Sequence, residues 1–171
     1  MSVQPIQDST ATIHLLTDDA WGPWFKAEIE KARSSVLLSI YMVSHHWRIP
    51  NRFGYDLLDI LQQCGRRGLT CSAILAGSET IKSRTPFNQG AAQALTDANW
   101  RVRAMRTARL LHEKVLLIDR RLTIIGSHNI SQASLTSNHD TSLAIESKPL
   151  AEQTWRLFWQ RWRVAEPWKP Q

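Results

Sequence analysis

The stretch from His112 to Asn129 carries residue types that suit an attack on a phosphodiester. It reads His-x-Lys, then four residues, Asp119, six further residues, and Gly-Ser-x-Asn, all within 18 positions. A histidine supplies a nucleophile that titrates near neutrality, and a lysine supplies a fixed positive charge. Serine and asparagine supply hydrogen-bond donors for the charge that develops on phosphate oxygens. The pattern therefore predicts phosphodiester chemistry that needs no metal ligand set.

This pattern resembles the HKD signature of the phospholipase D superfamily. The likeness extends to the downstream run Asn138-His139-Asp140, where the small nuclease branch of that family usually has Asn-x-Glu. The resemblance implies a phospholipase D-like fold and a phosphodiesterase that uses neither a cofactor nor a metal ion. It also implies a reaction through a covalent phosphohistidine.

Five side chains share the expected catalytic work. His112 is the expected nucleophile. Lys114, Ser127 and Asn129 are expected to bind the substrate phosphate and to stabilise the extra negative charge of the transition state. The resemblance assigns to Asp140 the acceptor that fixes the tautomer of the histidine ring and steadies the phosphohistidine. This aspartate is one methylene shorter than the usual glutamate, so the hydrogen-bond geometry is expected to differ.

Asp119 belongs to the signature and is thus a candidate catalytic residue, but we interpret it as mainly structural. In an extended strand alternate side chains share a face, so His112 and Lys114 point together while Glu113 points away. Asp119 lies seven residues after the histidine, at the end of the predicted strand, and points to the opposite face. There it can pair with an arginine of the turn at residues 119–121.

The reaction also needs an acid for the leaving oxygen and a base for the incoming water. One histidine cannot attack phosphorus and protonate the leaving group at the same time. Members of the resembled family usually carry two copies of the motif, whereas this chain has one. We therefore expect a homodimer through the active-site region, in which a second subunit supplies the second histidine.

Length and composition predict a single catalytic domain over residues 11–171, after a flexible polar leader at residues 1–10. The chain has 171 residues, a hydrophobic content of 43% and a net charge of +6. Seven basic residues and two acidic ones lie between Arg101 and Arg121, which favours a polyanionic substrate. No apolar run approaches the roughly 20 residues that a membrane span needs, so we expect a cytoplasmic protein without stable membrane insertion.

Alternating hydrophobic patterns predict an α-β-α sandwich around a mixed, largely parallel β-sheet. The motif is expected to straddle a hairpin whose turn lies at residues 119–121, and Gly126 is expected to let the chain turn tightly. Strands are predicted at residues 11–16, 36–42, 70–75, 102–105, 111–118, 122–125 and 141–146. Helices are predicted at about residues 20–32 and at 55–64, 91–98, 131–137 and 149–164.

Three further features have more than one interpretation. His45 and His46 follow a buried strand and are either loop residues or substrate contacts, and the same choice holds for Lys82 and Arg84 in the loop at residues 77–90. The last helix carries an aromatic stripe with arginines at its margin. We favour packing in the core or in a dimer, with base stacking on single-stranded nucleic acid or contact with an anionic membrane surface as alternatives. The stripe comprises Trp155, Phe158, Trp159 and Trp162, with Arg156, Arg161 and Arg163 between them.

The leading functional hypothesis is an endonuclease that cleaves DNA or RNA in a dimeric active site. A phospholipase D or phosphatidyltransferase that acts on phospholipid is the alternative, with the last helix as its interfacial anchor. A non-catalytic module that only binds phosphate is the third hypothesis. The intact motif argues against it, because binding alone does not require an attacking histidine.

Overall fold

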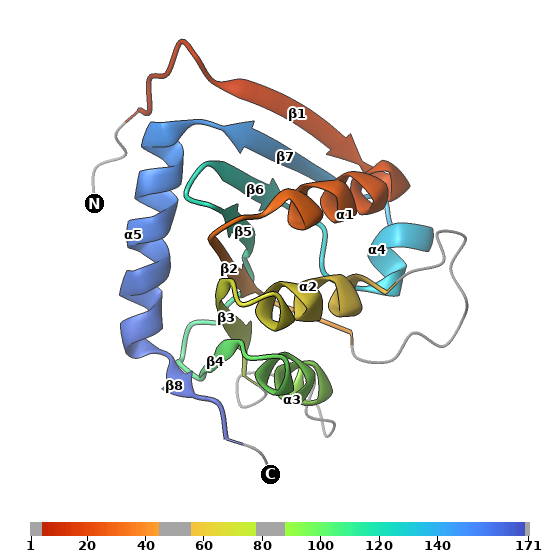
Figure 1. Ribbon diagram of the computed structural model, residues 1–171, viewed down its shortest axis with the longest axis vertical. Coiled ribbons are helices and arrows are strands. Elements are labelled where there is room, and N and C mark those ends of the chain that lie inside the picture. Colours follow the sequence, from red (N-terminus) through yellow and green to blue (C-terminus); the bar gives the residue numbers. More distant parts are fainter. Residues whose placement is uncertain (1–4, 45–55, 78–87, 170–171) are drawn as a thin grey trace.

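A computed structural model of the protein describes residues 5–44, 56–77 and 88–169 (Figure 1). The candidate substrate contacts His45, His46, Lys82 and Arg84 lie outside the described residues. Within the described part of the chain, eight strands form one sheet in the order β1-β7-β6-β5-β2-β3-β4-β8. The strands are β1 (Thr12–Thr17), β2 (Ser35–Ile40), β3 (Thr70–Ala76), β4 (Arg101–Met105), β5 (Lys114–Ile118), β6 (Leu122–Gly126), β7 (Thr141–Glu146) and β8 (Glu166–Pro167).

The sheet is mixed but mostly antiparallel, so the expectation of a largely parallel sheet was wrong. Strand β2 is parallel to β3, and β3 is parallel to β4. The other neighbours are antiparallel, including β2 with β5 and β5 with β6. Parallel neighbours need a long crossover, which α2 and α3 supply here. The tight turn at residues 119–121 forces β5 and β6 to run in opposite directions.

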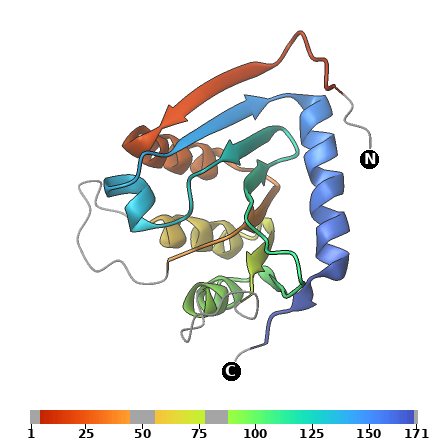
Figure 2. The ribbon, with the colours of Figure 1, turned by 180° about the vertical axis from the view of Figure 1, so that it is seen from behind.

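Helices cover both faces of the sheet, which confirms the α-β-α sandwich. The core on one side joins α1, α2 and α3 to strand residues such as Leu38 and Leu116. The core on the other side joins α5 to Leu37 and Leu117. Figures 1 and 2 show α5 apart from the other helices, on its own side of the sheet. The helices are α1 (Trp21–Lys31), α2 (Leu57–Arg66), α3 (Gln89–Asp97), α4 (Gln132–Thr136) and α5 (Lys148–Val164), with the 3-10 helix η1 (Asp18–Ala20) before α1.

Local sequence signals set the helix starts. Asp56 precedes α2, and its carboxylate accepts a hydrogen bond of 2.7 Å from the backbone N–H of Leu58. Burial raises the pKa of Asp56 to about 6. Ser147 caps α5 in the same way through the N–H of Leu150, and Pro149 occupies the first turn, where its missing N–H costs nothing. These caps explain why α2 and α5 begin where the chain leaves a strand or loop.

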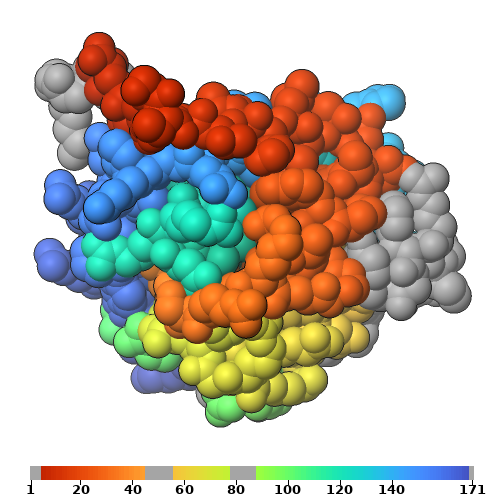
Figure 3. All heavy atoms as spheres, turned by 45° about the horizontal axis from the view of Figure 1, so that its top comes forward, coloured from red at the N-terminus to blue at the C-terminus, as the bar shows by residue number. Residues whose placement is uncertain are grey.

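Helix α5 covers only part of its face of the sheet. The strand register places Leu15, Leu143, Ile125, Val115 and Ser39 side by side on that face. Ser39 lies under α5, but Leu15 is 66% exposed and Ile125 is 47% exposed. Strand β1 runs along the outer edge of the molecule, as the space-filling view shows in red (Figure 3). The outer strands therefore present an apolar surface, which we call the open sheet face: Ile13, Leu15, Ile125 and Leu143.

Candidate active site

The sheet brings the predicted site residues to one of its ends. His112 precedes β5, Ser127 follows β6, and Asp140 precedes β7. Because β5, β6 and β7 are successive antiparallel neighbours, the start of β5, the end of β6 and the start of β7 meet at the same end of the sheet. Strand β5 begins at Lys114 rather than at residue 111. The histidine thus lies in the segment before the strand and not within it.

His112 and Lys114 lie against each other even though only the lysine belongs to the strand. The lysine Nζ donates a hydrogen bond of 2.9 Å to the backbone carbonyl of His112. The same Nζ lies 3.4 Å from each ring nitrogen of the histidine. The Tyr41 ring packs nearby, with its centroid 4.8 Å from that of His112 and 5.2 Å from Nζ. Partial burial lowers the pKa of Lys114, and the charge of Asp140 opposes this shift.

Glu113 points to the other side of the sheet, as expected. Its carboxylate accepts a hydrogen bond of 2.7 Å from the Ser39 hydroxyl. It also forms an ion pair with Arg161 of α5, at 2.8 Å between Oε1 and Nε. The residue between the histidine and the lysine of the motif therefore holds α5 against the sheet.

Asp140 is buried and accepts hydrogen bonds through both carboxylate oxygens. Ser127 donates to Oδ1 at 2.6 Å, and the Asn138 amide donates to Oδ2 at 3.3 Å. Burial favours the neutral acid, but hydrogen bonds from Ser127, Ser134 and Asn138 outweigh it and lower the pKa of Asp140. The backbone N–H of Asp140 also donates to Asp18 at the end of β1. The carboxylate is thus fixed in its charged form.

Asn129 joins this cluster through Ser134. Its backbone N–H donates a hydrogen bond of 3.1 Å to the Ser134 hydroxyl, which also bonds to Asp140. The Asn129 Oδ1 atom is buried and has no hydrogen-bond partner among the described residues. In the described part of the chain, no hydrogen bond joins Asp140 to His112. The expected bond from the histidine ring to Asp140 is therefore not present in the single chain.

Gly126 is required by the close approach of two strands rather than by a turn. A Cβ atom at this position would lie 2.3 Å from the Ser142 hydroxyl and 2.4 Å from the Thr141 carbonyl, both in β7. The chain bends at Ser127, whose backbone N–H donates to the Thr141 carbonyl and whose hydroxyl accepts from the Thr141 N–H, each at 3.0 Å. A small residue here lets the serine reach the start of β7.

The two histidines that alternate with motif residues do not join the cluster around His112. His128 is buried and stacks on Trp21, with ring centroids 4.9 Å apart. Its Nδ1 lies 2.8 Å from the Ser142 hydroxyl and its Nε2 lies 3.0 Å from the Asp18 carbonyl, and burial lowers its pKa. The side chain of His139 is fully exposed.

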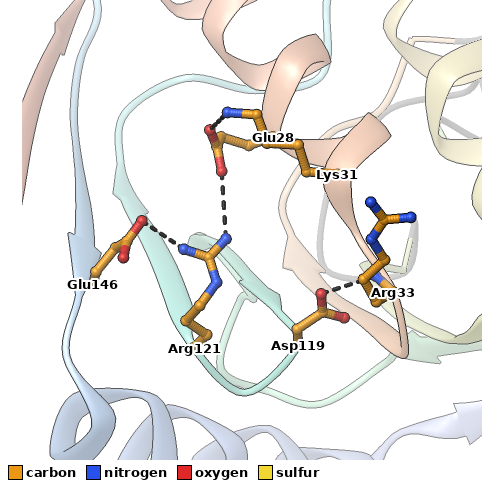
Figure 4. Close-up of polar contacts among 6 residues, drawn as sticks. All are labelled: Glu28, Lys31, Arg33, Asp119, Arg121 and Glu146. Atoms are coloured by element: carbon orange, nitrogen blue, oxygen red, sulfur yellow. Dashed lines mark hydrogen bonds and ion pairs between the residues drawn. The ribbon is translucent and has the colours of Figure 1, made fainter.

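Asp119 lies at the far end of β5 from His112, where it binds the chain that enters β2. Its carboxylate accepts hydrogen bonds of 2.8 to 2.9 Å from the backbone N–H groups of Arg33, Ser34 and Ser35. These bonds outweigh partial burial and lower the pKa of the aspartate. Figure 4 shows that the neighbouring Arg121 instead reaches two glutamates. The expected arginine partner of Asp119 is therefore replaced by backbone donors.

A groove of about 430 Å³ opens beside His112. Its wall includes Arg109, together with Arg161 and Val164 from the end of α5. His112, Arg109 and the ion pair of Arg161 with Glu113 thus border a space large enough for a substrate group. Among the described residues, no group of three or more histidine, cysteine or acidic side chains is placed to hold a metal ion.

Several residues of this region could not be found from the motif. Tyr41 comes from the end of β2, Asp18 from the end of β1, and Ser134 from α4. The order of the strands in the sheet brings each of these residues to the site, and the local spacing of residues in the sequence does not reveal that order. Asn138 was within reach, because it forms part of the Asn-x-Asp run that resembles the family pattern.

The family follows from a comparison with known protein families. A family model described as cardiolipin synthase, PLD-like domain, matches residues 25–162. That range covers more than half of the chain, so the protein belongs to the phospholipase D superfamily. No curated protein sequence matches the chain significantly.

Solved structures share the fold at low sequence identity. Nuc from Salmonella typhimurium, a phospholipase D family member, superposes with a TM-score of 0.76 at 17% identity, covering 93% of this chain and 99% of Nuc. NucT from Helicobacter pylori gives 0.67 at 16% identity, covering 92% and 99%. Phosphatidylserine synthase from Haemophilus influenzae gives 0.67 at 12% identity, covering 95% of this chain and 41% of the synthase.

No described helix is long and apolar enough to cross a membrane.

Proposed function

We propose that this protein is a phosphodiesterase that cleaves nucleic acid through a covalent intermediate on His112. The observation that carries the proposal is the contact of the lysine Nζ with both ring nitrogens of that exposed histidine. The pair lies beside a groove that also holds Arg109 and Arg161. A nucleophile next to fixed positive charge matches a phosphodiester, whose transition state gains negative charge.

The first step forms a bond between a ring nitrogen of His112 and phosphorus while the bond from phosphorus to the leaving oxygen breaks. Lys114 and Asn129 stabilise the charge on the non-bridging oxygens, whereas Ser127, expected in the same role, donates its hydroxyl hydrogen to Asp140. In the second step water attacks phosphorus, the P–N bond breaks, and the histidine is regenerated. The leaving oxygen needs a proton and the water must lose one, so a second titrating group has to be present.

We assign that group to the histidine of a second subunit, in a homodimer related by a two-fold axis. The open sheet face supports this assignment. Its apolar residues are exposed in the single chain, and Ile125 and Leu143 lie on the strands that end just before Ser127 and begin just after Asp140. Burial of this face against a second copy would remove apolar surface from water next to the site. In such a dimer, Asp140 bonds Ser127 of its own subunit and thereby helps to hold the residues of the assembled site in place.

The basic surroundings of the site favour nucleic acid as the substrate. Seven basic residues between Arg101 and Arg121 outnumber the two acidic ones. One of these arginines, Arg109, lines the groove beside His112, and a polymer with one phosphate per nucleotide meets such a basic surface repeatedly. We therefore prefer DNA or RNA over a lipid that offers a single phosphodiester.

The test compares the wild type with His112→Ala on single-stranded DNA, duplex DNA, RNA and phospholipid vesicles, in excess chelator. We expect nucleic acid to be cut by the wild type and the variant to lose at least about 10³-fold in rate. Acid-labile phosphate on the wild-type protein would report the covalent step. Failure of the wild type to cut any nucleic acid would refute the proposal.

A lipid phosphodiesterase or phosphatidyltransferase is the second candidate function. The family model is described as a cardiolipin synthase domain, and the phosphatidylserine synthase shares the fold. Turnover of vesicles alone in the same experiment would select this candidate. Binding without turnover on every substrate would instead identify a non-catalytic phosphate-binding module.

The dimer has a separate test. Leu15→Glu places a charge on the open sheet face, and Thr12→Glu places the same charge on the opposite side of β1, where residues are also exposed. We expect Leu15→Glu to shift the protein to a monomer in sedimentation experiments and to abolish activity together with the dimer. Thr12→Glu should change neither. A monomeric wild type with full activity would exclude the shared site.

A further inference from the structure

Helix α5 carries a second groove, which the reaction at His112 does not use. It has a volume of about 410 Å³ and lies along Trp155, Trp159 and Trp162, with Arg156 and Arg163 at its outer margin. We propose that this aromatic groove binds the single-stranded part of a nucleic acid whose cleaved phosphodiester lies at His112. The inference rests on the proposed nuclease function and adds a binding site to it.

The three indole rings form a ladder along the helix, in which neighbouring rings meet edge to face at interplanar angles of 65° and 69°. The centroids of Trp155 and Trp159 are 6.1 Å apart, and those of Trp159 and Trp162 are 5.5 Å apart. All three rings are only partly buried, while Phe158 from the same helix is buried and fills the core. The tryptophans therefore offer flat apolar surface to the groove beyond what the core needs. Bases of single-stranded nucleic acid stack on such surfaces without regard to sequence.

Arginines from other elements hold this ladder and make it positive. Arg120 from the β5–β6 turn lies 4.5 Å from the centroid of Trp155. Arg103 lies 4.9 Å from the Trp162 centroid, and Arg101 lies within 5.6 Å of both Trp159 and Trp162. Guanidinium groups over indole faces keep their charge while their planes pack on the rings.

Positive charge at the groove exceeds what its own carboxylates neutralise. Arg156 and Arg163 are exposed and add to the three arginines that lie on the rings. Within the described residues, Glu152 is the one carboxylate that bonds to any of these five arginines, through Arg120. A ligand that combines flat rings with repeated negative charge fits this surface, and a nucleic acid strand has both.

The aromatic groove and the groove beside His112 lie on opposite sides of α5, near its C-terminal end. Arg161 and Val164 line the histidine groove, while Trp162 and Arg163 line the aromatic groove. These four consecutive residues occupy one turn of the helix, whose rise is about 1.5 Å per residue. Successive residues of a helix are rotated by about 100°, so Arg161 and Val164 face one side of α5 and Trp162 and Arg163 face the other. A strand that leaves the reaction site therefore passes around the end of α5 to reach Trp162, and it can continue from there along the ladder.

A lipid surface fits the same residues less well. An interfacial helix exposes its apolar side chains at its outermost face so that they enter the bilayer. The fully exposed positions of α5 next to the ladder are instead Arg156, Gln160 and Arg163, and the tryptophans lie on the flank between helix and sheet. A concave aromatic flank receives a strand, but it does not insert into a membrane.

The test uses the double variant Arg156→Gln/Arg163→Gln in a His112→Ala background, so that substrate is bound and not cut. Neither arginine forms a hydrogen bond or ion pair within the described part of the chain, so folding should be unaffected. We expect the affinity for a labelled oligothymidylate of about 30 nucleotides to fall about tenfold or more, with a shallower dependence on salt. The matched control, Arg33→Gln/Arg66→Gln, removes two exposed arginines that line neither groove and should bind like the background protein.

A second variant, Trp159→Leu, tests stacking rather than charge. It should weaken binding of the same oligothymidylate by roughly fivefold to a hundredfold, with a melting temperature measured in parallel to verify folding. In the active protein, both variants should hydrolyse bis(p-nitrophenyl) phosphate like the wild type, because this small diester does not reach the groove. Unchanged oligothymidylate binding by the arginine variant, or loss only of binding to anionic vesicles, would overturn the proposal.

The two proposals fail separately. If oligothymidylate binding depends on Arg156 and Arg163 but the wild type cuts no nucleic acid, the groove stands and the nuclease function falls. If the wild type cuts nucleic acid and both groove variants bind and cut like the wild type, the nuclease function stands and the groove falls.

Discussion

The two ends of strand β5 carry the residues of one sequence motif but differ in how their charges are satisfied. At the far end, Asp119 accepts hydrogen bonds from three consecutive backbone N–H groups, and Arg121 reaches two glutamates. At the near end, Lys114 donates to a backbone carbonyl, and among the described residues the polar and ring contacts of the exposed His112 side chain are those with the lysine and Tyr41. Charges at the far end are neutralised within the fold, whereas those at the near end remain available to a ligand.

This difference separates structural from chemical members of the motif. A carboxylate with a full set of donors stabilises the native state and has little capacity left for substrate. Partial burial disfavours the charged form of Lys114 and lowers its pKa, and the nearby charge of Asp140 offsets this only in part. Lys114 at the near end of β5 is therefore in an environment that is unfavourable for its charge, as suits a site that binds phosphate.

Among the variants that test this contrast between the two ends of β5, Lys114→Met is expected to have the largest effect. Methionine retains the length of the side chain but removes the charge that would face the phosphate. We expect kcat to fall about 10²- to 10³-fold and the free energy of unfolding to stay equal or rise slightly, because a partly buried charge is removed. Denaturant unfolding and turnover should be measured on the same preparation.

Lys26→Met is the matched control for this variant. Lys26 pairs with Glu30 one helical turn away in α1, remote from the site. It should leave turnover unchanged and alter stability by at most about 0.5 kcal/mol. Equal effects of the two substitutions on turnover would show that the near end is not special.

The sequence predicted the elements of this molecule better than their neighbours in space. Strand β7 and helix α5 were found nearly to the residue, because alternating apolar positions and the Ser147-Lys148-Pro149 start are local signals. The two-residue strand β8 has no such pattern, and the sheet was mostly antiparallel although a largely parallel one was expected. Strand order depends on which apolar faces pack together, and no short segment encodes that choice.

The residues of the site likewise divide into those that local sequence signals predicted and those that such signals missed. The motif placed His112, Lys114 and Ser127 at one end of the sheet, because a hairpin returns the chain to its starting edge, and the family resemblance added Asp140. The contacts of Tyr41 and Asp18 were missed, since they come from strands distant in sequence. Gly126 was assigned to a tight turn, but the missing Cβ instead makes room for β7, a neighbour that local spacing does not reveal.

Asp119→Asn should have a smaller effect, and on stability rather than chemistry. Asparagine retains one acceptor but loses the charge that three N–H groups stabilise, so we expect a loss of about 1–2 kcal/mol in the free energy of unfolding at pH 7. Turnover per folded molecule should remain within about twofold of the wild type. A large loss of turnover with unchanged stability would return Asp119 to the catalytic set.

The direction of the pKa shift of Asp119 predicts how the stability difference between wild type and Asp119→Asn changes with pH. The pKa of Asp119 is lower in the folded chain than its ordinary value of 3.8, so the native state favours the charged form. Its contribution is present above pH 3.8 and is lost as the pH falls below that value toward the folded pKa. The stability difference between wild type and Asp119→Asn should thus be constant from pH 5 to 7 and shrink below about pH 4. A difference that grew on acidification would contradict the assignment.

The smallest effect at the far end is expected for Arg121→Met, although Figure 4 shows this arginine between two glutamates. Arg121 and Glu146 are both more than 40% exposed, so solvent screens their attraction. Glu28 is nearly buried but also pairs with Lys31 at 2.6 Å, so it keeps a partner when the arginine is removed. We expect a loss of at most about 1 kcal/mol that diminishes in high salt, against no change for Arg33→Met, whose backbone alone serves Asp119. A larger loss that persisted in high salt would mean that the far end is held by this ion network and not by the aspartate of the motif.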